Sequence, residues 1–211
     1  MPMHQRWTLH VEQFARFQQA DIELRPLTLF VGENNSGKSY MATLLWGLLA
    51  LGRTVFPTAT PTTKAYKTCQ SRLMGLMGAA VQKLHQGSRL PEVALSTEDQ
   101  QCFIDWFNEL LQQNRNKLAA RLFGDKAITI GRLSLDNYRR HKPLRIKLET
   151  SSTPARMSAR AEHSVRLPLL EEDNLLKGPD QYRAVCMITW KLVAGDISVP
   201  LFGPRSATRR S

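Results

Sequence analysis

Hydrophobic and polar residues alternate near the amino-terminal end of the chain. Trp7, Leu9 and Val11 are separated by polar residues, and Ile22 and Leu24 repeat the same spacing. A period of two is typical of half-buried β-strands, so two strands are predicted here. The intervening segment "QFARFQQA" is expected to form the turn of an antiparallel pair.

A continuous apolar run at residues 27–31 follows the strand pair. A run of this length is typical of a strand that is covered on both faces, and we expect one here. Residues 39–51 are apolar on all sides and end before Gly52, which predicts a buried helix. Residues 53–63 are rich in Pro and Thr and are expected to form a loop.

Two further helices are predicted from apolar residues spaced three and four apart. The first covers residues 65–84. The second begins at "STED", where Ser96 and Asp99 resemble a capping box, and it ends at Gly124. We interpret residues 64–124 as a helical insertion.

Beyond this insertion the apolar spacing returns to two. The predicted strands cover residues 128–135, 144–148 and 165–169. The alternation slips by one residue at Gly131, which predicts a bulge. Since the strands follow one another along the chain, an antiparallel, basic β-meander is expected over residues 126–170. A last helix is predicted over 178–195 and a last strand over 197–201.

Length and composition favour one folded domain over residues 1–211, with 42% apolar residues. Cys69, Cys102 and Cys186 lack the Cys-x-x-Cys spacing of metal sites, and we interpret them as reduced, buried thiols. The five histidines are scattered without ligand spacing. No apolar run reaches the length of a membrane span, and the chain does not open with an apolar leader, so a cytoplasmic protein is expected.

Positive charge is concentrated in one part of the chain. The net charge is +11, and residues 115–166 hold thirteen Lys or Arg against four Asp or Glu. Such a block can attract the phosphate backbone of a nucleic acid, although many basic segments are only solvated surface. The candidate nucleic-acid contacts are Arg139, Arg140, Lys142, Arg145 and Lys147.

The segment "GENNSGKS" at residues 32–39 matches the Walker A pattern Gly-x-x-x-x-Gly-Lys-Ser. Glycines allow a tight turn in which successive N–H groups face a phosphate, and the following helix adds its positive end. Lys38, the candidate catalytic residue, is expected to reach the β and γ phosphates of ATP, and Ser39 to ligate Mg²⁺. The candidate nucleotide contacts are Gly32, Glu33, Asn34, Asn35, Ser36, Gly37, Lys38, Ser39 and Tyr40.

The stretch "PLTLFVGENNSGKS", preceded by a strand pair that contains "FARF", resembles the start of ABC-class ATPases of the RecF, SMC and OLD-nuclease kind. The close match covers about residues 7–52. The resemblance implies an α/β P-loop NTPase lobe that binds ATP and Mg²⁺, with a role in DNA processing or phage defence. It also implies that Asn35 lies near the γ-phosphate and that Phe14, Arg16 and Phe17 lie near the nucleotide; packing is the alternative role for the two phenylalanines.

The chain departs from this family in two motifs. Neither a Walker B segment, four apolar residues followed by Asp-Glu, nor a Ser-Gly-Gly-type signature is evident. "CFIDWF" lies in a helical pattern, and "KLVAGDIS" is interrupted by Gly195. We therefore expect the N-terminal lobe of a longer ATPase, whose hydrolysis depends on a homodimer or a second chain that supplies the carboxylates.

Two other classes of protein stay open at this stage. One is a stand-alone P-loop kinase that acts on a small molecule, although such kinases usually open directly with the loop strand. The other is a nucleic-acid-binding protein with a vestigial nucleotide site, which the basic block would serve.

Overall fold

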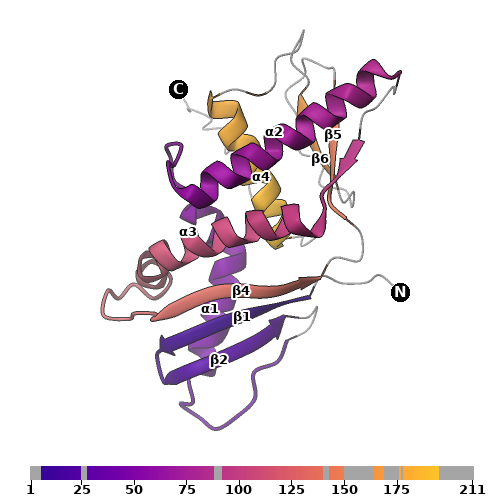
Figure 1. The fold of residues 1–211 in the computed structure, drawn as a ribbon. Helices are drawn as coiled ribbons and strands as arrows, with labels where there is room; N and C mark the ends of the chain where they lie inside the picture. Colours follow the sequence, from indigo (N-terminus) through magenta and orange to yellow (C-terminus); the bar gives the residue numbers. More distant parts are fainter. Residues whose placement is uncertain are drawn as a thin grey trace, which may run out of the picture.

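The computed structural model describes residues 6–24, 28–87, 92–139, 143–149, 164–168, 176 and 178–194. These residues form a mixed α/β structure with two small open sheets and four α-helices (Figure 1). The strands are β1 (Arg6–Phe14), β2 (Phe17–Leu24), β3 (Glu92–Ala94), β4 (Arg132–Arg139), β5 (Arg145–Glu149) and β6 (Ser164–Pro168). The helices are α1 (Lys38–Leu51), α2 (Lys64–His85), α3 (Thr97–Phe123) and α4 (Gly178–Ala194), with a 3₁₀ turn at Gly52–Val55.

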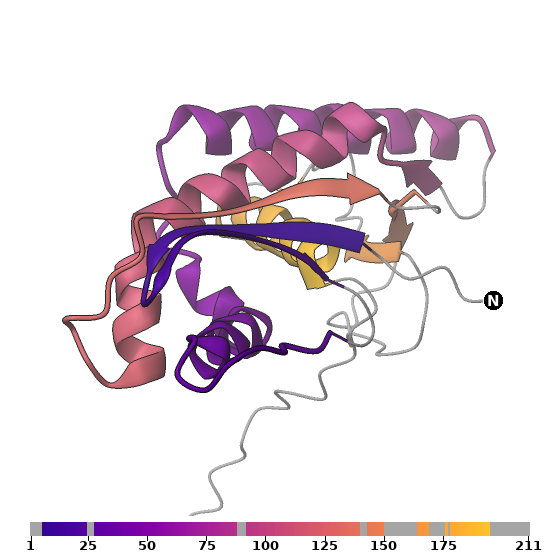
Figure 2. The same cartoon turned by 90° about the horizontal axis from the view of Figure 1, so that it is seen from below.

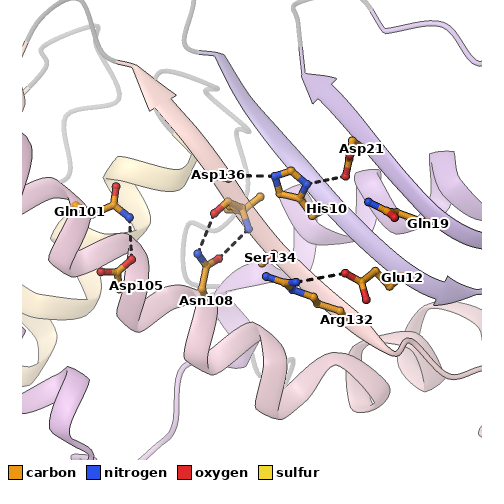
Figure 3. Close-up of a pocket in the computed structure, with 11 residues that line it drawn as sticks. His10, Glu12, Gln19, Asp21, Gln101, Asp105, Asn108, Arg132, Ser134 and Asp136 are labelled. Atoms are coloured by element: carbon orange, nitrogen blue, oxygen red, sulfur yellow. Dashed lines mark hydrogen bonds and ion pairs between the residues drawn. The ribbon is translucent and has the colours of Figure 1, made fainter.

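The first sheet has the strand order β2-β1-β4, and both pairings are antiparallel. The predicted strand pair is confirmed, with a tighter turn than expected because Phe14 already pairs with Phe17. Trp7, Leu9 and Val11 are buried on one face, and they share one hydrophobic core with the buried residues of α1. The other face of the sheet is polar (Figure 3).

The predicted β-meander is wrong. β4 pairs with β1, which lies near the amino-terminal end of the chain. β5 pairs antiparallel with β3 and parallel with β6 in a second sheet. The three-residue strand β3 is too short to show a period in the sequence, so its pairing with β5 was not foreseen. The parity change predicted at Gly131 lies just before β4, where the Gly131 N–H donates at 2.8 Å to the carbonyl of Glu12, the residue that pairs with Arg132. A further register shift in the β1–β4 pairing lies between Arg6 and Thr8.

Residues 28–31 do not form the covered strand that their apolar character predicts. They lie outside both sheets, and the side chains of Leu29 and Val31 are 74% and 87% exposed. A buried strand needs paired strands at its edges and apolar cover on both faces; here Phe30 packs against the core, while the described residues pair no strand with this segment and leave Leu29 and Val31 uncovered. Helix α1, which follows it, is confirmed and lies behind the first sheet (Figures 1 and 2).

The predicted starts of the two long helices are confirmed. The Thr63 hydroxyl accepts a hydrogen bond from the Tyr66 N–H at 3.3 Å and caps α2. At the start of α3, the Ser96 hydroxyl accepts from the Asp99 N–H at 3.1 Å, and the Asp99 carboxylate accepts from the Ser96 N–H at 3.1 Å. This reciprocal pair is a capping box and satisfies two helix-end groups at once. Gly124 ends α3 in the left-handed conformation, with a φ of 68°.

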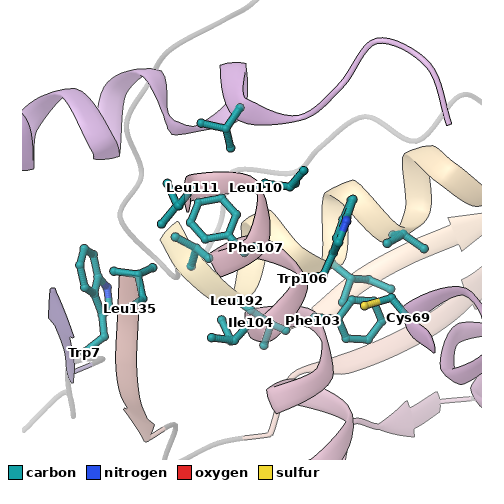
Figure 4. Close-up of a cluster of buried hydrophobic side chains, with 14 of the residues drawn as sticks. Trp7, Cys69, Phe103, Ile104, Trp106, Phe107, Leu110, Leu111, Leu135 and Leu192 are labelled. Atoms are coloured by element: carbon teal, nitrogen blue, oxygen red, sulfur yellow. The ribbon is translucent and has the colours of Figure 1, made fainter. Parts of the chain in front are cut away.

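Helix α3 contributes the bulky, buried rings of Trp106, Phe103 and Phe107 to the core (Figure 4). The Trp106 ring is fully buried, and its centroid lies 5.6 Å from that of Phe56, 5.5 Å from that of Tyr66 and 6.5 Å from that of Tyr182. These rings come from the loop before α2, from α2 itself and from α4. Trp106 therefore joins three separate segments in one aromatic cluster.

Helix α3 also closes the outer edge of β4 with its side-chain amides. The Asn108 amide donates to the Leu135 carbonyl at 2.9 Å and accepts from the Leu135 N–H at 2.8 Å, as Figure 3 shows. The Gln112 amide accepts from the Leu133 N–H at 3.1 Å and donates to the Gly131 carbonyl at 3.2 Å. Each side-chain amide thus makes the hydrogen bonds that the backbone of a neighbouring strand would otherwise make.

The spacing of these amides matches the geometry of the strand. Asn108, Gln112 and Asn116 are four residues apart, which is about 6 Å along a helix. Two residues of a strand span about 6.6 Å, so Asn108 and Gln112 meet successive outward-facing backbone groups of β4, at Leu135 and Leu133. Asn116 accepts from the Ile130 N–H at 2.9 Å, three residues before Leu133 and just outside β4. An edge covered in this way is closed to pairing with another chain.

We expect Gln112→Leu to lower the free energy of unfolding by about 1–3 kcal/mol, because it leaves the Leu133 N–H and the Gly131 carbonyl without their partners. Gln113→Leu is the matched control, since Gln113 is the exposed neighbour and contacts only Glu109 among the hydrogen bonds of this helix face. Its effect should stay within about 0.5 kcal/mol. Urea unfolding of both variants measures the difference, and equal stabilities would contradict the role of the amides.

Candidate functional site

The candidate nucleotide loop, residues 32–39, has an unusual backbone with positive φ angles at three residues. Gly32, Asn35 and Gly37 have φ values of 148°, 67° and 92°. Glycine adopts such angles without strain, and asparagine is one of the few other residues that tolerate the left-handed region. Left-handed residues alternating with ordinary ones turn successive N–H groups toward a common point, which suits an anion.

The Lys38 side chain folds back over this loop. Its Nζ donates to the Gly32 carbonyl at 2.8 Å, to the Glu33 carbonyl and to Ser36 Oγ at 3.2 Å. The contacts with the two carbonyls are exposed to solvent. An ammonium held by exposed carbonyls can exchange them for phosphate oxygens at little cost, because both kinds of partner are hydrogen-bond acceptors.

The amino-terminal end of α1 is not capped by a side chain. Gly37 occupies the N-cap position and offers no side-chain cap, and the first turn of α1 contains no acidic residue. The first N–H groups of a helix have no partner within the helix, and the helix dipole makes this end positive. Ser39 lies in this first turn and is exposed, so its hydroxyl can reach a bound ion.

The turn of the β1–β2 hairpin packs directly against the loop. A Cβ atom placed on Gly37 would lie 2.7 Å from Cε2 of the Phe17 ring, so only glycine fits there. Phe14 is fully buried, and its ring contacts those of Tyr40 and Phe123 at centroid distances of 6.3 and 5.7 Å. Phe14 therefore has the packing role, while the exposed Arg16 stands beside Phe17 in the turn next to the loop.

Gly37→Ala is expected to abolish tight nucleotide binding and to lower the melting temperature. An alanine at a φ of 92° costs about 1–2 kcal/mol of backbone strain, and its methyl group would displace the Phe17 ring. Gly75→Ala in α2 is the control, because a Cβ there meets nothing within 4 Å. This control should raise stability by about 0.5–1 kcal/mol and leave binding unchanged. Thermal melts with and without MgATP test both variants.

The candidate nucleic-acid contacts are only partly described by the structure. Arg140 and Lys142 lie outside the described residues, and for Arg139 only the backbone, in β4, is described. Arg145 and Lys147 lie on β5, and both pair with Glu92 of β3, the second with an Nζ to Oε2 distance of 3.8 Å. One carboxylate thus partly neutralises both side chains.

Neither weak candidate for a Walker B carboxylate gains support. Asp105 of "CFIDWF" lies on α3, where its Oδ1 accepts from the Gln101 amide at 2.7 Å, and it lines a groove to which no residue of the loop contributes. Asp196 of "KLVAGDIS" lies outside the described residues. Among the described residues, no carboxylate is therefore assigned to orient an attacking water.

The groove on the polar face of the first sheet was not foreseen from the sequence. It has a volume of about 380 Å³ and lies between this face and α3 (Figure 3). His10 Nδ1 lies 2.6 Å from Asp21 Oδ1, His10 Nε2 lies 3.9 Å from Asp136 Oδ2, and Glu12 pairs with Arg132 at 3.3 Å. The available signal was the run of alternate polar residues in β1 and β2. These side chains pair with one another across the strands and form the solvated face of the sheet.

No protein-family model, curated protein or solved structure matches the chain. Within the described residues, no helix is both long enough and apolar enough to span a bilayer. The same residues contain no group of three or more His, Cys, Asp or Glu side chains placed to bind a metal ion.

Proposed function

We propose that the chain binds MgATP through residues 32–39 as the nucleotide-binding lobe of a P-loop ATPase. The observation that carries the proposal is the position of Lys38, whose ammonium lies over a loop with three positive-φ residues at an uncapped helix end. A cation, a loop with positive φ angles and a positive helix end in one place favour an anion such as a polyphosphate.

Each group has a separate role in this proposal. The loop N–H groups hold the phosphate chain, Lys38 neutralises charge on the β and γ phosphates, and the Ser39 hydroxyl ligates Mg²⁺. Asn35 is part of the loop, and the exposed Arg16 is next to Phe17, whose ring packs against Gly37. These two side chains are proposed to contact the terminal phosphate or the nucleoside. Bound ATP supplies a reactive phosphoanhydride, and what this chain's residues contribute is its position and charge neutralisation.

Hydrolysis is proposed to require a second lobe. The described residues assign no carboxylate to the attacking water, and positioning of that water is a main source of rate in phosphoryl transfer. Leu29 and Val31, directly before the loop, are 74% and 87% exposed, and Trp46 of α1 is 62% exposed. Large apolar side chains exposed beside a candidate site favour a contact with another protein surface, either a second copy or a separate chain. The link to DNA processing or phage defence is proposed from the sequence resemblance.

The test is a ligand panel followed by a turnover assay on the purified chain. MgATP should bind in a saturable 1:1 manner, AMP should bind at least about tenfold more weakly because it lacks the β and γ phosphates, and Ser39→Ala should remove most of the Mg²⁺ dependence. No phosphate release by the chain alone is expected. Equal affinity for ATP and AMP would show that the loop does not hold the phosphate chain, and the proposal would be wrong.

A further inference from the structure

Two cysteines that are 33 residues apart in sequence meet between α2 and α3. Cys69 Sγ lies 3.5 Å from Cys102 Sγ and donates to the Cys102 carbonyl at 3.3 Å. Cys69 is fully buried, while Cys102 is partly accessible to solvent. A disulfide has an S–S distance of about 2.05 Å, so the two sulfurs need to approach by only about 1.5 Å.

The surroundings distinguish the two thiols. The hydrogen bond from Cys69 lowers the pKa of the Cys102 thiol, and the guanidinium of Arg72, one turn along α2, lowers it further. The same hydrogen bond, together with burial, raises the pKa of Cys69. Cys102 is thus the thiol that more readily forms a thiolate, and it is also the more exposed one, which are the two properties of a reactive cysteine.

We propose that Cys69 and Cys102 form an oxidation site that takes a small hydroperoxide and closes as an intramolecular disulfide. The Cys102 thiolate attacks the peroxide oxygen, the O–O bond breaks, and the leaving group departs as hydroxide or alkoxide, which leaves a sulfenic acid. The Cys69 thiol then attacks the Cys102 sulfur, the S–O bond breaks, and water leaves. The two thiols supply two electrons, and the hydroperoxide accepts them.

Cys186 of α4 is the internal control. Burial raises the pKa of its thiol to about 11, so it holds far less thiolate near neutral pH than Cys102. Three thiols allow three intramolecular pairs. The proposal requires the pair of Cys69 and Cys102 to dominate, with Cys186 unpaired.

The experiment treats the reduced, folded full chain with hydrogen peroxide and follows its intact mass and peptide map without reductant. The expected product has lost two hydrogens, carries one linkage between Cys69 and Cys102, melts at a higher temperature and returns to the starting form with dithiothreitol. In Cys69→Ser, a sulfenic acid on Cys102 should be trapped by dimedone at least about tenfold faster than one on Cys186. Cys186→Ser should leave the linkage unchanged.

Several results would overturn the proposal. One is oxidation of the wild type without a linkage, seen as a gain of oxygen alone. Another is a linkage through Cys186 or between two chains, and a third is trapping of Cys102 no faster than of Cys186. Since the linkage is mapped in the wild-type chain, the test holds even where a serine variant fails to fold. Nucleotide binding plays no part in it, so it stands or falls separately from the proposed function.

Discussion

Lys38→Ala should weaken MgATP binding by about 100-fold or more while leaving the fold intact. The side chain is only partly buried, and its hydrogen-bond partners are two exposed carbonyls and the Ser36 hydroxyl, so its removal disturbs little packing. The ammonium would supply charge-assisted hydrogen bonds to phosphate worth about 3 kcal/mol together, which corresponds to roughly two orders of magnitude in affinity. Isothermal titration calorimetry measures the change.

The matched control is Lys64→Ala. Lys64 is exposed and, like Lys38, is the first residue of a helix, so the substitution removes the same charge from an equivalent position. It tests whether the net charge of +11 attracts ATP without the loop. If Lys64→Ala reduced the affinity as much as Lys38→Ala, general electrostatic attraction would explain the binding and the site would be misplaced.

Trp106→Ala is expected to cost about 3–5 kcal/mol of folding free energy, because it leaves a cavity among rings from three segments. This is a large part of the stability of an ordinary domain. Trp106→Phe should cost less than half as much: it keeps a ring and removes the indole N–H, which is buried and has no acceptor among the described residues. Guanidinium unfolding measures both variants.

Trp46→Ala is the control for this series. Trp46 is 62% exposed on α1, and its loss should change the free energy of unfolding by no more than about 0.5 kcal/mol. Equal destabilisation by Trp46→Ala and Trp106→Ala would contradict the placement of the core at α3. An oligomer dissociated by Trp46→Ala would instead identify the exposed surface as a contact with a second copy.

The helices were predictable because their signals are local. The stripe of α2, the capping box of α3 and the glycine that ends it all lie within the element that they define. The first hairpin was predictable for the same reason, since its two strands are adjacent and alternate cleanly. The loop of the candidate site carries its own signal in the spacing of Gly32, Gly37 and Lys38.

Features that depend on distant partners were not predictable. The pairing of β4 with β1 and the contact of Cys69 with Cys102 join segments far apart in sequence, and a residue pattern says nothing about which strand or helix lies beside it. Residues 28–31 were predicted wrongly for a different reason. An apolar run indicates that a segment is suited to burial, but it does not show whether another part of the chain covers it. The amide series on α3 was missed because Asn and Gln on a helix are usually solvated.

The most direct test of the central claim is the response of the backbone amides to MgATP in a heteronuclear NMR titration of the ¹⁵N-labelled chain. The account predicts that the amides of residues 34–39 shift most, that they saturate together at one equivalent of nucleotide, and that the shifts disappear in Lys38→Ala. Shifts that gather on other parts of the chain, with the loop amides unmoved at saturating MgATP, would contradict it.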